Sequence, residues 1–167
     1  MLDYAEDLRR TVIAVSASLA DLSADDAARR PAPGKWSPKE IIGHLVDSAA
    51  NNHQRFVHAQ LQDDLVFPGY AQDAWVDVQR YQDAPWPHLV ALWREYNLHI
   101  ARLMEAVPEK ERLRPRSRHN LHQLAWAAVP EDRPTTLDYF MCDYVDHLHH
   151  HVRQLSAISR PLSADRS

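Results

Sequence analysis

The chain has 167 residues, enough for one domain with a sizeable core, and 45% hydrophobic with 25% charged residues is ordinary for a soluble globular protein. A net charge of −4 argues against nucleic acid as a partner, and a single cysteine excludes an intramolecular disulfide. The acidic amino terminus and the lack of any run of about 18 apolar residues argue against a signal peptide and a membrane span, so we expect a cytoplasmic protein.

Helical periodicity begins at the amino terminus of the chain. Apolar residues at helical spacing predict a first helix over residues 3–22, and a single helical turn is expected just after Ser23. A second helix is predicted over residues 37–60. Its start is marked by the sequence Ser-Pro-Lys-Glu at 37–40, which is a capping box with proline at the first helical position.

The inward face of this second helix carries His44 among its apolar residues, with Ser48 and Arg55 on later turns of that face. Arg55 has two interpretations, a contact with an anionic substrate group or an ion pair with an acidic residue, and we favour the ion pair. Asp47 either orients the ring of His44 or is solvated.

The middle of the chain contains two long connections around the clearest amphipathic helix, which is predicted over residues 87–107. Residues 63–85 show no sustained period and are expected to form a packed loop, in which Trp75 is the tryptophan we expect to line a site. The second connection, residues 109–134, includes a basic run over 110–118 that we expect to be solvated.

A fourth helix is predicted over residues 135–159, capped by Thr135 or Thr136. It carries His147 and His151, which are four residues apart and therefore lie on one face, and this face is otherwise apolar.

Four helices of this length predict an all-α fold, a four-helix bundle with long connections between the helices. We expect a single domain over residues 1–160 and a frayed carboxyl-terminal tail over 161–167.

Three neutral imidazoles from two helices, His44, His147 and His151, can bind a first-row divalent metal ion. Three protein ligands leave a coordination position open, as in catalytic sites, and water bound there has a lowered pKa. The spacing alone leaves an alternative, a set of imidazoles held by hydrogen bonds. The metalloprotease pattern His-Glu-x-x-His is absent, and no catalytic base is identified.

Two other residues near the histidines also have two interpretations. Asp143 lies one turn before His147 and either orients its ring or is solvated. Cys142 is expected to be a packed thiol rather than a nucleophile.

Two segments resemble the DinB-like superfamily, and within it the YfiT-like metal-dependent hydrolases. The first is residues 36–48, with the sequence WSPKEIIGHLVDS, followed by Asn51 and Arg55-Phe56; the second is the pair His147 and His151 followed by Gln154-Leu155. The resemblance extends over residues 8–158. It implies a four-helix bundle, a metal site formed by His44, His147 and His151, bound zinc or nickel, and a homodimer.

The first hypothesis is therefore a metal-dependent hydrolase that activates water against a small-molecule substrate, with neither nucleic acid nor membrane as a partner. The resemblance also implies an alternative, a thiol S-transferase that uses a low-molecular-weight thiol such as bacillithiol or mycothiol. The third hypothesis is a bundle that binds a metal or small ligand without catalysis.

Overall fold

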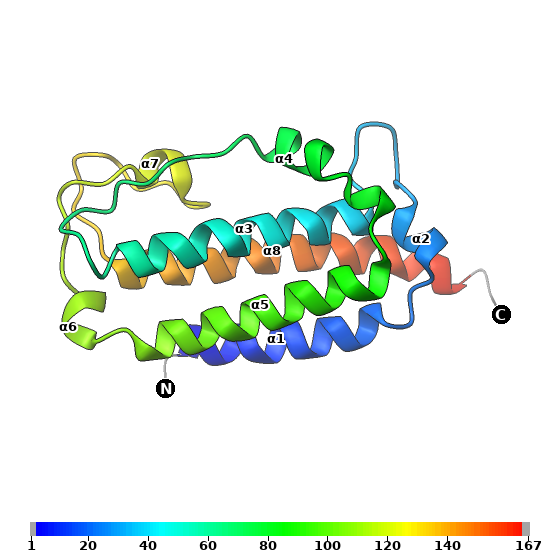
Figure 1. Cartoon of the computed structure of the whole chain (residues 1–167), viewed down its shortest axis with the longest axis horizontal. Coiled ribbons are helices and arrows are strands. Elements are labelled where there is room, and N and C mark those ends of the chain that lie inside the picture. Colours follow the sequence, from blue (N-terminus) through cyan, green and yellow to red (C-terminus); the bar gives the residue numbers. More distant parts are fainter. Residues whose placement is uncertain (1–2, 165–167) are drawn as a thin grey trace.

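The computed structural model describes the backbone of residues 3–164 and the side chains of residues 3–158. Four long helices form a bundle, α1 (Asp3–Leu19), α3 (Pro38–His58), α5 (Trp86–Ala106) and α8 (Leu137–Ala164) (Figure 1). The shorter helical segments are α2 (Ala24–Ala28), α4 (Gln72–Gln79), the 3-10 turn η1 (Tyr81–Asp83), α6 (Glu109–Arg112) and α7 (Leu121–Leu124). The predicted all-α four-helix bundle is confirmed.

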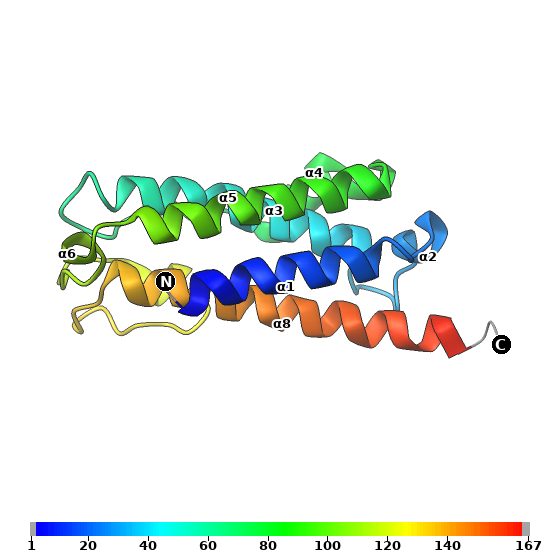
Figure 2. The same ribbon diagram turned by 90° about the horizontal axis from the view of Figure 1, so that it is seen from below.

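The order of the helices around the bundle differs from their order in the chain. Helix α1 packs against α5 and α8, and α3 packs against the same two helices, so α1 and α3 lie diagonally across the bundle (Figure 2). Helices α3 and α5 run in the same direction, opposite to α1 and α8 (Figure 1). Since α3 has 21 residues and is about 30 Å long, the chain must cross back along the bundle before α5 begins. This topology accounts for the long connection over residues 63–85.

Local capping signals determine where two of the helices begin. Ser37 accepts a hydrogen bond from the Glu40 amide while the Glu40 carboxylate accepts one from the Ser37 amide, so the capping box is confirmed. At the start of α8, the Thr136 hydroxyl accepts from the Tyr139 amide at 3.1 Å, which identifies Thr136 rather than Thr135 as the cap.

Two predicted helix ends differ from the structure. Helix α1 ends at Leu19 instead of residue 22, and α8 continues to Ala164 instead of ending at 159. Of the tail predicted over 161–167, residues 165–167 lie outside the described residues.

The expected loop over residues 63–85 contains α4 and η1, which the sequence pattern did not predict. The turn η1 lies against α3 at Gly43, where an added Cβ atom would come within 2.1 Å of Tyr81 Cδ2. The Tyr81 hydroxyl donates to Asp47 Oδ1 at 2.6 Å. A glycine on α3 thus allows a tyrosine from a distant segment to pack directly on the helix.

The two long connections are joined to each other. The Leu65 amide donates to the Arg118 carbonyl at 3.0 Å, and the Asn120 amide donates to the Leu65 carbonyl at 3.2 Å. The Asn120 side chain adds two bonds to Phe67, accepting from its amide at 3.1 Å and donating to its carbonyl at 2.8 Å. These bonds hold residues 65–67 beside 118–120 over one side of the bundle.

The basic run over 110–118 is not uniformly solvated, contrary to our expectation. The side chain of Arg116 is buried and donates to the carbonyl oxygens of Ala59, at 2.9 Å, and Glu111, at 3.0 Å. Its neighbour Arg114 pairs with Asp63 at 3.1 Å. These arginines therefore anchor the second connection to the end of α3.

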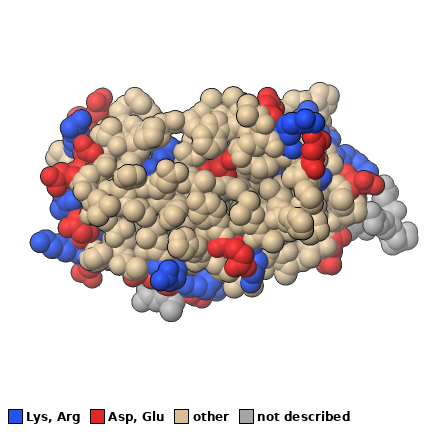
Figure 3. Space-filling view, in the orientation of Figure 1, with Lys and Arg blue, Asp and Glu red and all other residues tan. Residues whose placement is uncertain are grey.

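Charged side chains gather toward the two ends of the molecule, and the middle of the face in Figure 3 is mostly uncharged. None of the helices described here is long and apolar enough to span a membrane.

Candidate functional site

Three imidazoles from α3 and α8 meet between the two helices. The Nε2 atoms of His44 and His147 are 3.4 Å apart, and those of His147 and His151 are 3.0 Å apart. The candidate ligand atoms of all three rings lie within 4.8 Å of one another. Residues separated by about a hundred positions in the sequence therefore reach one point, as the spacing predicted for His44, His147 and His151.

Burial keeps these imidazoles neutral. His44 is fully buried, and burial lowers its pKa to about 3, with smaller contributions from the neighbouring rings of His151 and His147. Burial likewise lowers the pKa of His147 to about 3 and lowers that of His151, although a hydrogen bond to Gln154 acts in the opposite direction on His151. At neutral pH all three rings are in the form that binds metal ions.

The hydrogen bonds of His151 determine which of its nitrogens carries the proton. Its Nδ1 lies 2.8 Å from Gln154 Oε1, and Gln154 Nε2 lies 3.0 Å from His150 Nε2. Because the amide oxygen only accepts, Nδ1 of His151 must donate, which leaves a lone pair on Nε2 directed at His147. Metal-binding histidines commonly donate their other ring N–H in this way.

The donor set fits a divalent cation. Nitrogens about 2.1 Å from a tetrahedral ion are about 3.4 Å apart, close to the 3.4 Å and 3.0 Å separations of His147 from its two neighbours, while all separations within the set stay within 4.8 Å. Hydrogen bonds satisfy the triad less well, since a proton on His147 Nε2 can serve only one of its two neighbours. Nδ1 of His44 is buried without a hydrogen-bond partner among the described residues, so nothing in the protein fixes its tautomer.

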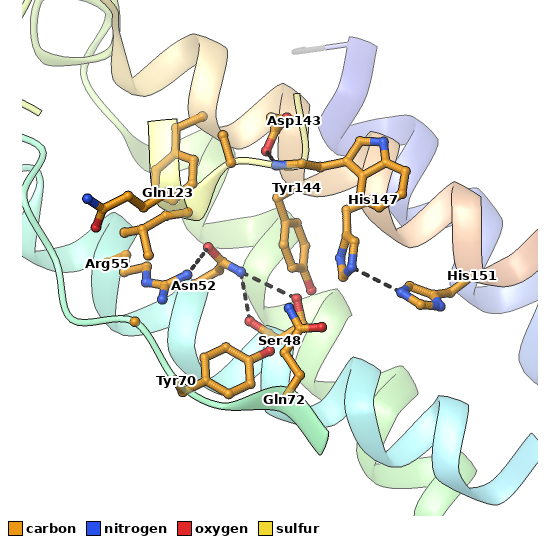
Figure 4. A pocket seen from close by; sticks show the side chains of 15 residues that line it. Ser48, Asn52, Arg55, Tyr70, Gln72, Gln123, Asp143, Tyr144, His147 and His151 are labelled. Atoms are coloured by element: carbon orange, nitrogen blue, oxygen red, sulfur yellow. Dashed lines mark hydrogen bonds between the residues drawn. The ribbon is translucent and has the colours of Figure 1, made fainter. Parts of the chain in front are cut away.

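A cavity of about 340 Å³ opens beside the histidines (Figure 4). Its floor is formed by α3 and α8, and its cover by parts of the two long connections. The lining residues are Ser48, Asn52, Arg55, Gly69, Tyr70, Gln72, Gln123, Leu124, Ala125, Trp126, Phe140, Asp143, Tyr144, His147 and His151.

Neither predicted role of the two aspartates is correct. Asp143 accepts from the backbone amides of Trp126, at 2.8 Å, and Ala127, at 2.7 Å, and so holds the second connection on α8. Asp47 is buried and accepts from Tyr81 and from Gln79 Nε2, the latter at 2.7 Å. Both carboxylates fix loops that were not visible in the sequence pattern.

The preferred ion pair of Arg55 is also wrong. Its guanidinium donates to Asn52 Oδ1 at 3.3 Å and to the Pro68 carbonyl at 2.8 Å, and no carboxylate of the described residues pairs with it. Cys142 is exposed, not packed as expected, and is not among the residues that line the cavity.

Sequence reasoning selected the wrong tryptophan. Trp75 is 40% exposed and packs on Tyr70, with ring centroids 4.9 Å apart, outside the cavity. Trp126 lines the cavity instead, 5.6 Å from the ring of His147 and 4.4 Å from that of His150. Trp126 follows a short turn of helix in a segment without periodicity, so no sequence signal distinguished it.

Both the sequence and the fold of this chain resemble those of known proteins. The sequence profile of the DinB superfamily matches residues 7–155. "Putative metal-dependent hydrolase YfiT" of Bacillus subtilis (strain 168) is 22% identical over 127 residues, which are 76% of this chain but 66% of that protein, slightly less than two thirds of its length.

The fold is similar to a solved structure of YfiT from Bacillus subtilis, described as a probable metal-dependent hydrolase with an unusual four-helix bundle topology. The TM-score is 0.73 with 19% identity, and the match covers 98% of this chain and 90% of the other. At this identity the likeness establishes the fold.

Proposed function

The chain belongs to the DinB superfamily, and because its imidazoles cluster at one point we propose that His44, His147 and His151 bind a divalent metal ion with which the protein hydrolyses a small substrate. Zinc and nickel are the ions we favour, because imidazole nitrogen suits both. The related protein YfiT carries a metal-dependent hydrolase name, which supports the same activity here.

The observation that carries the proposal is the meeting of three neutral imidazoles beside a cavity, of which His44 and His151 are buried and His147 is partly exposed. When bound there, a divalent ion supplies Lewis acidity and lowers the pKa of a water molecule to about 7. The protein contributes the geometry. Gln154 orients the ring of His151, and Asp143 holds the loop that covers the cavity at Trp126.

Metal analysis of purified variants tests the site. We expect about one ion per chain in the unmodified protein and less than a tenth of that in His147→Ala, since two imidazoles from different helices bind far more weakly. His149→Ala is the matched control, because His149 is on the same helix but contacts Asp7 at 2.6 Å. Full metal content in a folded His147→Ala protein would refute the assignment.

Hydrolysis is tested on the same proteins with panels of carboxylic esters, amides and phosphoesters. The expected result is turnover that disappears on chelation, returns with added metal, and is absent in His147→Ala but retained in His149→Ala. Turnover that survives in the metal-free protein would contradict a metal-dependent reaction.

One feature favours a second activity, thiol S-transfer. Of the residues that the structure describes, Asp143 is the only carboxylate lining the cavity, and both its oxygens accept backbone N–H groups, so none of these carboxylates is free to act as a base there. A low-molecular-weight thiol brings its own nucleophile, whose pKa falls near a metal ion. With monochlorobimane, the thiol would lose its proton to water, its sulfur would form a carbon–sulfur bond and chloride would leave, and this reaction should depend on added bacillithiol or mycothiol.

A further inference from the structure

Arg55 is a buried cation without a matching anion. Its exposed fraction is 6%, and none of the described aspartates or glutamates forms an ion pair with it. Enclosing a charge away from water is costly, and buried charges are normally paired. Burial disfavours the charged guanidinium and is the main reason that the pKa of Arg55 is below its ordinary value.

The Arg55 guanidinium has hydrogen-bond donors that its two contacts do not use. Two of its N–H groups are used, one on Asn52 Oδ1 and one on the Pro68 carbonyl. A guanidinium carries five N–H groups in a planar fork, so three remain for another acceptor. Arg55 lines the same cavity as His147 and His151, so a ligand in the cavity can reach its side chain.

The surroundings of Arg55 suit an anion. Tyr70 and Gln123 line the cavity at this end (Figure 4). Burial raises the pKa of Tyr70 to about 12, so its hydroxyl keeps a proton to donate at neutral pH. Asp143, the one carboxylate of the lining, is already occupied by two backbone amides and does not neutralise Arg55.

Arg55 and the histidines lie at opposite ends of the cavity. In Figure 4 Arg55 and Gln123 occupy one side of the view, and His147 and His151 the other. On α3, His44 and Arg55 are eleven residues apart and face the same way, which corresponds to about 16 Å along the helix axis. A ligand in contact with both ends must be elongated.

We propose that the cavity binds an elongated small molecule with a terminal carboxylate, which Arg55 holds while the opposite end of the molecule lies at the histidines. A carboxylate is favoured over a phosphate because, among the described residues, one arginine and no lysine line the cavity, and the planar guanidinium matches the two oxygens of a carboxylate. That this molecule is the substrate of the reaction at the histidines rests on the proposed function.

Binding to the metal-free protein tests the inference without any metal chemistry. The probes are hexanoate, its uncharged isostere hexanamide, and hexyl phosphate, with dissociation constants measured by chemical-shift titration. We expect hexanoate to bind at least tenfold more tightly than hexanamide and more tightly than hexyl phosphate. In Arg55→Gln the preference for hexanoate over hexanamide should disappear, while Arg153→Gln, which removes an exposed arginine of α8, should retain it.

Three results would overturn the proposal. One is equal affinity of the unmodified protein for hexanoate and hexanamide, which needs no variant and stands even if Arg55→Gln does not fold. Another is an unchanged preference in folded Arg55→Gln, and the third is a preference for hexyl phosphate. Loss of metal binding at the histidines would not alter any of these results, so the carboxylate site and the metal site can fail separately.

Discussion

His44 is fully enclosed, and its ring is the only one of the three that comes from α3. Trp36 covers one side of it, with ring centroids 5.0 Å apart, and the histidines of α8 occupy another. Such a ring is stable only as the neutral species, which prepares it for a metal ion but makes the metal-free protein sensitive to acid.

The acid sensitivity gives a prediction for His44. Its pKa is about 3 in the folded protein against 6.5 as the ordinary value, so between these pH values the unfolded chain binds more protons and the free energy of unfolding falls as pH decreases. Moving from pH 7 to pH 5 should remove about 2 kcal/mol through this residue. Urea unfolding of the metal-free proteins should show that the free energy of unfolding falls less between pH 7 and pH 5 in His44→Asn than in the unmodified protein.

The control for this measurement is His88→Asn, which replaces an exposed histidine of α5 and leaves the three clustered rings in place. If His44→Asn and the unmodified protein lose the same stability between pH 7 and pH 5, the ring of His44 is not buried as a neutral species.

Contacts between elements decide how the site is enclosed, and one of them joins η1 to α3. Gly43 lies one residue before His44, and Tyr81 occupies the space that a side chain at position 43 would fill. The same tyrosine donates to Asp47 one turn later. The first long connection is thereby fixed to the helix that supplies one of the three imidazoles.

Gly43→Ala should therefore destabilise the protein, although alanine is the better helix former by about 1 kcal/mol. The added Cβ would lie 2.1 Å from Tyr81 Cδ2, and overpacking of this kind costs about 1–3 kcal/mol, more if the bond to Asp47 is lost. Thermal or urea unfolding measures the change. Gly69→Ala is the control, where the nearest atom, in Leu124, is 3.6 Å away. An unchanged or increased stability of Gly43→Ala would contradict the packing of Tyr81 on α3.

In the whole molecule, the order and direction of the four long helices create the cavity. Because α3 and α5 run in the same direction, the chain between them must travel the length of the bundle, and it does so over α3. The second connection lies beside it and is held by Asn120. Two loops that are far apart in sequence thus form a single cover over the cavity.

Asn120→Ala should loosen this cover without unfolding the bundle. It removes the two side-chain hydrogen bonds to Phe67, which at about 1 kcal/mol each would speed hydrogen exchange at the Phe67 amide by about tenfold or more. Asn51→Ala is the matched control, because the Asn51 amide bonds only to a carbonyl of its own helix, that of Asp47. Equal exchange at Phe67 in both variants would show that the loops are held by other contacts.

Much of this protein was predictable from interactions within one or two helical turns. The capping box at Ser37 and the spacing of His147 and His151 depend on backbone groups and side chains that are neighbours in sequence. Four amphipathic stretches of similar length then limited the fold to a bundle, and the inward face of the second helix indicated the third imidazole, as did the resemblance of residues 36–48 to a family.

Tertiary structure alone decided the order of the helices, the contact of Tyr81 with Gly43, and the loops that Asp143 and Asn120 hold. It also left Arg55 without a carboxylate, where the sequence favoured an ion pair. The physical reason is that each of these features depends on which distant segments come into contact. Packing and topology determine those contacts. A carboxylate or a guanidinium has the same local sequence signal whether its partner is water, a backbone amide, another side chain or a ligand.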